Sequence, residues 1–118
     1  MQKTALIIED DFSIFLVLEL ILQDKAIRAL HADSIAETKA LLEKISPEII
    51  FVDNWLPDGS GIEFIPVLRR KFSDALIITM TAQSTAEIRK LSSVNGADLF
   101  LEKPFAMNDV YESISSRI

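Results

Sequence analysis

Short hydrophobic runs alternate with amphipathic runs along the whole chain. The hydrophobic runs are typical of buried strands in a parallel sheet, which are covered on both faces. They lie at Thr4–Ile8, Ala26–His31, Ile49–Val52, Leu76–Met80 and Asp98–Leu101. The amphipathic runs predict helices at Phe12–Asp24, Ile35–Lys44, Gly61–Lys71, Thr85–Asn95 and Asn108–Arg117. Five strand–helix units with short joints predict an α/β domain with a parallel sheet and helices on both faces.

Several helix ends have local signals. The segment Ser34–Glu37 has the spacing of a capping box, which predicts that the second helix begins there. Pro47 is expected to end that helix before the third strand. Asn95 and Gly96 predict a left-handed cap after the fourth helix. Pro66 is expected to start or bend the third helix, because proline lacks the amide proton that an uninterrupted helix uses.

Composition narrows the class of protein. The 118 residues suit one domain, and 49% of them are hydrophobic, which is enough for a core. The net charge of −6 argues against direct binding to nucleic acid. There is no cysteine, which excludes disulfides and thiolate metal sites, and His31 alone cannot form a histidine cluster. The longest apolar stretch, Ile14–Leu22, is too short to span a membrane, and no signal peptide is evident, so a cytoplasmic protein is expected.

Charged residues follow three of the hydrophobic runs. Glu9 and Asp10 follow the first run, Asp53 follows the third, and Lys103 follows the fifth. The carboxyl ends of parallel strands meet at one edge, where open α/β sheets bind ligands. Oxygen ligands without histidine or sulfur suit Mg²⁺, with Mn²⁺ as an alternative. These residues therefore predict a metal site suited to phosphoryl transfer rather than a structural cage.

Asp53 is the candidate phosphoryl acceptor at this site. A carboxylate can form an acyl phosphate when a cation relieves the repulsion between the reacting charges, and Lys103 suits that role. A hydroxyl at the end of the fourth strand is a candidate partner for the phosphoryl oxygens. Alternation does not separate Thr79 from Thr81, but a strand that extends to Thr81 favours Thr81, and the small Ala82 leaves room for the phosphoryl group.

These motifs together resemble those of response-regulator receiver domains, the CheY-like family of two-component signalling. The resemblance rests on Ile8–Asp11, Asp53–Gly61, Thr81–Ala82 and Lys103–Phe105, which occur in the family's order and spacing. It implies one receiver domain over residues 1–118. The implied fold is a doubly wound (βα)5 sandwich of the flavodoxin and CheY type, with five parallel strands in the order 2-1-3-4-5.

The resemblance also implies roles at the site. Glu9, Asp10 and Asp53 would hold Mg²⁺ together with the backbone carbonyl of Trp55. Asp53 would accept a phosphoryl group from a phosphohistidine on a histidine kinase or histidine phosphotransfer protein, and Lys103 would bind that group. The domain would assist only its own phosphorylation and dephosphorylation and would not be an enzyme acting on other substrates.

Further residues would transmit and time the signal in such a domain. Thr81 is expected to move toward the phosphoryl group, and Phe100, at the aromatic switch position, is expected to swing inward with it. Trp55 and Gln83 lie two residues past Asp53 and Thr81. Residues at such positions tune hydrolysis in the family, and the bulky Trp55 predicts a long-lived phosphoform.

Two surfaces are candidates for partners. The fourth helix, fifth strand and fifth helix form the family's usual output surface, for an output domain, a target protein or a second copy. The segment Asn108–Glu112 lacks the arginine found in dimerising members with winged-helix domains. The first helix is hydrophobic on most sides, and its outward residues are either scattered or a patch for a kinase, a phosphotransfer helix or a second copy. The residues expected to face the sheet are Ile14, Val17, Leu18, Ile21 and Leu22, and those expected on other faces are Phe12, Phe15, Leu16 and Leu20.

Two alternatives share the same architecture. A phosphohydrolase with an aspartyl-phosphate intermediate generally needs a second carboxylate two residues after the nucleophile, where this chain has Trp55. A flavin- or nucleotide-binding module needs a glycine-rich or hydroxyl-rich loop after the first strand. Here Glu9, Asp10 and Asp11 occupy that position and would repel a phosphate in the absence of metal.

Overall fold

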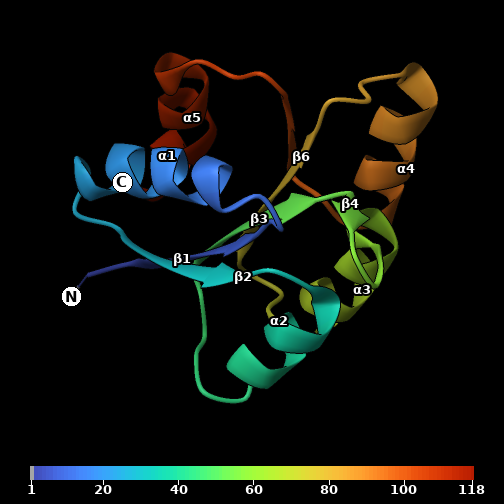
Figure 1. Cartoon of the computed structure of the whole chain (residues 1–118), viewed down its shortest axis with the longest axis horizontal. Coiled ribbons are helices and arrows are strands. Elements are labelled where there is room, and N and C mark those ends of the chain that lie inside the picture. Colours follow the sequence, from blue (N-terminus) through green and yellow to red (C-terminus); the bar gives the residue numbers. More distant parts are fainter. Residues whose placement is uncertain (1) are drawn as a thin grey trace.

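The computed structural model describes residues 2–118 and consists of a central sheet between two layers of helices (Figure 1). The strands are β1 Thr4–Ile8, β2 Arg28–Ala32, β3 Ile49–Asp53, β4 Trp55–Leu56, β5 Gly59–Ser60, β6 Leu76–Thr81 and β7 Leu99–Glu102. The helices are α1 Phe12–Gln23, α2 Ile35–Leu41, α3 Gly61–Lys71, α4 Ala86–Asn95 and α5 Met107–Ile114, with a 3₁₀ turn at Ser115–Arg117. The predicted strand–helix alternation is confirmed.

The main sheet has five parallel strands in the order β2-β1-β3-β6-β7. This order is the predicted 2-1-3-4-5 once the short β4–β5 hairpin is left out. That antiparallel hairpin pairs Trp55 with Ser60 directly after the central strand, and the hydrophobic pattern does not predict it. Its two-residue strands are too short to give a periodic signal.

Two hydrophobic cores lie on opposite faces of the sheet. Side chains alternate along each strand, so Ala5 and Ile7 of β1 face one core while Leu6 and Ile8 face the other. Helices α1 and α5 cover the first face, and α2, α3 and α4 cover the second (Figure 1). Both faces of the central strands are therefore buried, which explains their continuous hydrophobic runs.

The prediction for the faces of α1 is partly wrong. Leu18, Ile21 and Leu22 are buried as expected, but Val17 is 50% exposed and Phe15 is only 6% exposed. Nearly every position of this helix is apolar, so its pattern offers little contrast for choosing a face. Phe15 therefore belongs to the core and is not part of an exposed patch on this helix. The exposed apolar side chains of the helix are Phe12, Leu16, Val17 and Leu20.

Helix boundaries follow local hydrogen bonds. Ser34 caps α2 by accepting from the amide of Glu37 at 3.1 Å, but the helix ends at Leu41, before Pro47 is reached. Gly96 caps α4 in the left-handed conformation at φ 116°, as predicted. Pro66 does not start the third helix, because α3 begins at Gly61 and continues past the proline.

Asn95 explains how α3 accommodates its proline. Pro66 has no amide proton to donate to the carbonyl of Ile62, four residues earlier. The side-chain amide of Asn95 in α4 donates to that carbonyl at 2.9 Å. A contact between two helices thus replaces the missing bond within one helix.

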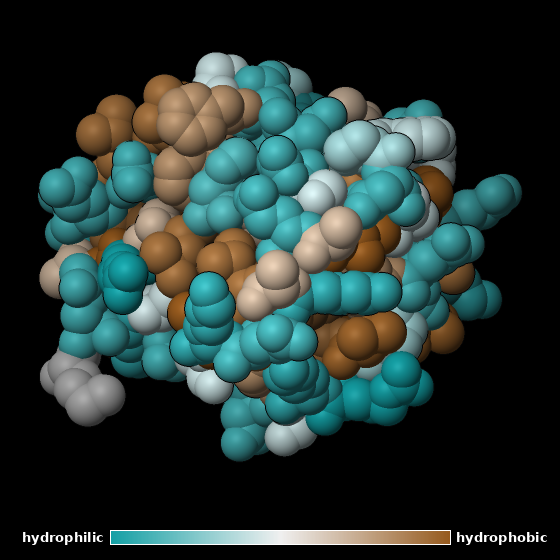
Figure 2. All heavy atoms as spheres, turned by 60° about the horizontal axis from the view of Figure 1, so that its bottom comes forward, coloured by the Kyte–Doolittle hydropathy of each residue, from teal (hydrophilic) through white to brown (hydrophobic). Residues whose placement is uncertain are grey.

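Hydrophilic atoms prevail on the face drawn in Figure 2, and hydrophobic atoms form separate patches there. Within residues 2–118, none of the helices has the length and hydrophobicity needed to cross a membrane.

Candidate functional site

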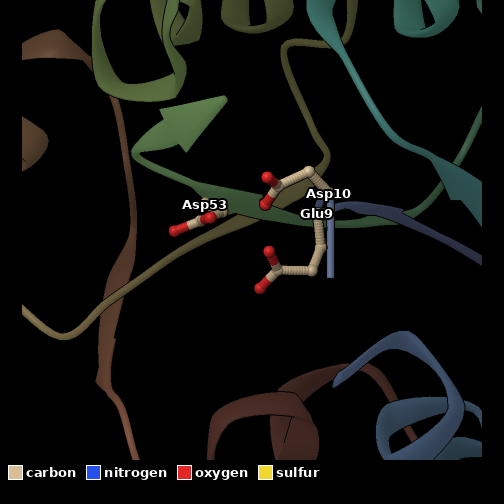
Figure 3. Close-up of side chains that lie close together, drawn as sticks. All are labelled: Glu9, Asp10 and Asp53. Carbon is tan, nitrogen blue, oxygen red and sulfur yellow. The ribbon is translucent and has the colours of Figure 1, made fainter. Parts of the chain in front are cut away.

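Three carboxylates meet at the C-terminal edge of the sheet. Strands β1 and β3 are paired in register from Ala5↔Ile49 to Ile8↔Val52, so both end at the same level. Glu9 and Asp10 follow β1, and Asp53 is the last residue of β3. One oxygen from each carboxylate lies within 4.8 Å of the others, and the side chains extend into the same space (Figure 3). The predicted convergence is confirmed.

Lys103 immediately follows β7, the strand at one edge of the sheet, and its side chain reaches the carboxylates from that edge. Its backbone amide donates to the carbonyl of Thr81 at 3.0 Å, which holds the segment against the end of β6. Its ammonium nitrogen lies 2.5 Å from Oε1 of Glu9 and 3.4 Å from Oδ1 of Asp53. One cation is therefore shared by the two buried carboxylates.

Burial determines the electrostatics of Glu9 and Lys103. Glu9 has no exposed surface, and Asp53 is 5% exposed, whereas Asp10 is exposed. Burial, only partly offset by the hydrogen bond from Lys103, raises the pKa of Glu9 to about 7, and the charge of Asp53 adds to the rise. Burial alone would lower the pKa of Lys103, but its bond to Glu9 and the nearby charge of Asp53 raise that pKa overall. In this arrangement one ammonium does not fully compensate the negative charge.

The donor set fits a divalent cation. Three carboxylates within reach of one another offer only oxygen atoms, which Mg²⁺ and Mn²⁺ prefer. The raised pKa of Glu9 indicates that an additional positive charge would be stabilised there. Glu9, Asp10 and Asp53 are therefore suitable ligands, and the part predicted for the carbonyl of Trp55 stays a prediction.

The two candidate hydroxyls at the end of β6 have different partners. Thr79 is fully buried, and its Oγ1 lies 2.5 Å from Oγ of Ser92 in α4. Thr81 is also buried, and its hydroxyl oxygen accepts a hydrogen bond from the amide of Gln83 at 3.1 Å. The engagement of Thr79 with α4 leaves Thr81, at the strand end, as the hydroxyl at the edge of the site.

The remaining predicted residues, Phe100, Trp55 and Gln83, are not members of the carboxylate cluster. Phe100 is partly buried in β7, with the guanidinium carbon of Arg89 4.4 Å from its ring centre. Trp55 is 63% exposed in β4, and Gln83 is exposed in the loop after β6. Their switching and lifetime roles stay predictions.

The loop after Asp53 is held by residues whose roles the sequence pattern does not predict. The side-chain oxygen of Asn54 accepts from Oγ of Ser60 at 2.7 Å and from the amide of Ile62 at 3.2 Å. Gly61 packs so closely behind Asp53 that an added Cβ would lie 1.9 Å from the Asp53 carbonyl oxygen. A glycine at the start of a predicted helix is the sequence feature that could have indicated this close approach, because glycine has no Cβ.

Asp58 connects this loop to α2. Its two carboxylate oxygens accept from the amides of Ile35 and Ala36 at 2.8 and 2.9 Å. These bonds lower the pKa of Asp58. The loop that follows the acceptor strand is thus held at two points, by Asn54 at its start and by Asp58 at its turn.

Comparison with known proteins gives a consistent result. The family model described as response regulator receiver domain matches residues 5–115. The KDP operon transcriptional regulatory protein KdpE of Escherichia coli K12 is 36% identical over 112 residues, which cover 92% of this chain and 48% of that protein. The chain spans about half the length of the curated relatives it matches.

Solved structures share the whole fold. A CheY-like response regulator receiver domain protein from Methanospirillum hungatei has a TM-score of 0.92 at 26% identity, covering 99% of this chain and 94% of the other. The beryllofluoride-activated NtrC4 receiver domain dimer has a TM-score of 0.91 at 27% identity, covering 98% and 95%. These likenesses extend over the sheet edge that carries the acidic cluster.

Proposed function

The chain belongs to the response regulator receiver domain family of two-component systems, and on this premise we propose that Asp53 is its phosphoacceptor. The observation that carries the proposal is the position of the Asp53 carboxylate. It lies at the end of the central strand, 3.4 Å from the ammonium of Lys103 and within 4.8 Å of the Glu9 and Asp10 carboxylates. We assign residues 1–118 to one receiver domain.

In the proposed reaction, an oxygen of the Asp53 carboxylate forms a bond to phosphorus as the phosphorus–nitrogen bond of a phosphohistidine breaks. The leaving imidazole takes up a proton. The donor is a histidine kinase or a histidine phosphotransfer protein. The product is an acyl phosphate on Asp53, which water later hydrolyses.

The other residues of the site make this transfer feasible. Glu9, Asp10, Asp53 and the carbonyl of Trp55 would hold Mg²⁺, which supplies positive charge to the phosphoryl oxygens when bound. Lys103, already between the two buried carboxylates, would bind a phosphoryl oxygen and offset its added charge.

Thr81 and Phe100 would then couple the modification to partner affinity. The phosphoryl group brings about two negative charges and new acceptor oxygens. Thr81 and Phe100 would have two arrangements in equilibrium. The phosphoryl group shifts that equilibrium only to the extent that it binds one arrangement better than the other. Phe100 lies in the edge strand beside Arg89 of α4, so its movement would alter the surface formed by α4, β7 and α5.

That surface is our proposed contact for an output domain, a target protein or a second copy. It carries the exposed apolar side chains of Leu91, Val94 and Leu99. The domain itself would not bind nucleic acid or membrane, and it would act in the cytoplasm. It would catalyse no reaction on other substrates, so a generic phosphoester should give no sustained phosphate release.

The test is intact mass after incubation with acetyl phosphate or phosphoramidate and Mg²⁺. Wild type should gain one phosphoryl group, Asp53→Asn should gain none, and the exposed-acid control Asp33→Asn should match wild type. Chelating the Mg²⁺ should prevent the gain. A phosphoryl group on Asp53→Asn, or none on wild type with either donor, would contradict the assignment.

The lifetime roles of Trp55 and Gln83 have a separate test. Trp55→Ala and Gln83→Ala should each change the hydrolysis half-life of the phosphoform, and loss of the Trp55 ring should shorten it by admitting water. Equal half-lives in wild type and Trp55→Ala would remove the shielding role and leave the phosphoacceptor assignment intact.

A further inference from the structure

His31 lies beside the acidic cluster although it is far from it in sequence. It belongs to β2, where it is paired with Ile7 of β1. Its Nε2 atom lies 2.6 Å from the backbone carbonyl oxygen of Glu9. A carbonyl oxygen only accepts hydrogen bonds, so Nε2 must carry the proton in this contact.

Aromatic packing holds the imidazole in place. The ring centre of Phe15 lies 4.7 Å from that of His31, and the ring centre of Phe12 lies 5.5 Å away. Phe15 is part of the core, so the imidazole is supported by a fixed neighbour. The ring therefore donates from a restricted position rather than from a freely rotating side chain.

The contact falls at the point where the chain leaves β1. The amide of Glu9 donates to the carbonyl of Ala32 at 2.9 Å, and the carbonyl of Glu9 accepts from His31. Both backbone polar groups of Glu9 are thus tied to β2. In a continuing strand, the adjacent side chains of Glu9 and Asp10 would point to opposite faces of the sheet. Here both carboxylates reach one site, which requires a defined backbone direction at Glu9.

We propose that His31 is a positioning residue for this cation site: its Nε2–H fixes the Glu9 carbonyl and so orients the Glu9 and Asp10 carboxylates toward Asp53. The inference rests on the proposed function, because it concerns the site's affinity for Mg²⁺. Groups behind the direct ligands commonly change metal affinity when they are removed, since they fix the ligands before the metal arrives.

Two substitutions separate donation from packing. His31→Phe keeps an aromatic ring but removes the donor, whereas His31→Gln places an amide N–H near the position of Nε2. Mg²⁺ affinity is measured without a phosphodonor, from backbone amide shifts in NMR titrations of the whole chain. His31→Phe should weaken binding roughly five- to tenfold, and His31→Gln should restore most of the affinity.

A measurement on metal-free wild type does not depend on any variant folding. The ring nitrogen shifts of His31 at neutral pH should show Nε2 protonated. An unprotonated Nε2 would overturn the proposal, as would wild-type affinity in His31→Phe, or equal losses in His31→Phe and His31→Gln. These results leave the phosphoacceptor assignment standing, whereas a wild-type protein that binds no Mg²⁺ at all would overturn both.

Discussion

Replacing Glu9 with Gln should change how the stability of the metal-free protein depends on pH. The Glu9 carboxyl has no exposed surface, and burial raises its pKa from the ordinary 4.5 to about 7. A carboxyl with a raised pKa in the folded state binds its proton more tightly there than in the unfolded chain. Its contribution to stability is therefore fully present below pH 4.5 and is lost as the pH rises through about 7.

The magnitude follows from the two pKa values. A tenfold change in an equilibrium corresponds to about 1.4 kcal/mol. Ionisation of Glu9 should therefore lower the free energy of unfolding by about 1 kcal/mol at about pH 5.5 and by about 3 kcal/mol at about pH 8. Glu9→Gln does not ionise, so its stability relative to wild type should increase by about 2 kcal/mol across this range.

Urea unfolding followed by far-ultraviolet circular dichroism at both pH values, with a chelator present, measures this difference. The exposed Glu43→Gln is the matched control and should keep the wild-type pH dependence. Added Mg²⁺ at the higher pH should stabilise wild type more than Glu9→Gln, because the cation favours the ionised carboxylate. Parallel pH dependences of wild type and Glu9→Gln would refute the reasoning.

Three further predictions concern the surroundings of the site. Gly61→Ala should lower the free energy of unfolding by about 3 kcal/mol in urea titrations, because the new Cβ would overlap the Asp53 carbonyl; wild-type stability would contradict this. Thr79→Val and Ser92→Ala should each cost about 1–3 kcal/mol by stranding a buried hydroxyl, and the double variant should cost less than their sum in a double-mutant cycle. Asp58→Asn should lose less stability than wild type as the pH falls, because the pKa of Asp58 is lowered and its contribution to the free energy of unfolding is lost as the pH falls through that value. The same acid unfolding curve in Asp58→Asn and wild type would exclude its anchoring role.

The arrangement of strands and the acidic edge were predictable from local patterns. The hydrophobic runs ending in Glu9, Asp53 and Lys103 predicted strands whose carboxyl ends meet, and the structure brings these residues together. The faces of α1 were not predictable, because Val17 and Phe15 are both apolar and only packing on the sheet separates them. In the same way, Pro66 predicted a break or bend in the third helix, but the sequence pattern did not reveal that Asn95 of α4 compensates for the missing hydrogen bond.

Local patterns were enough to predict which residues could form the site, because strand period, helix period and capping signals act over a few neighbouring positions. The way in which those residues are held and charged depends on contacts that form only when the chain packs. Three hydrogen bonds join segments that are distant in sequence. His31 donates to the carbonyl of Glu9, Thr79 bonds to Ser92, and Asn95 donates to the carbonyl that Pro66 leaves without a partner in α3. The raised pKa of Glu9 likewise depends on burial and on the distance to its neighbours, which exist only once the chain has packed.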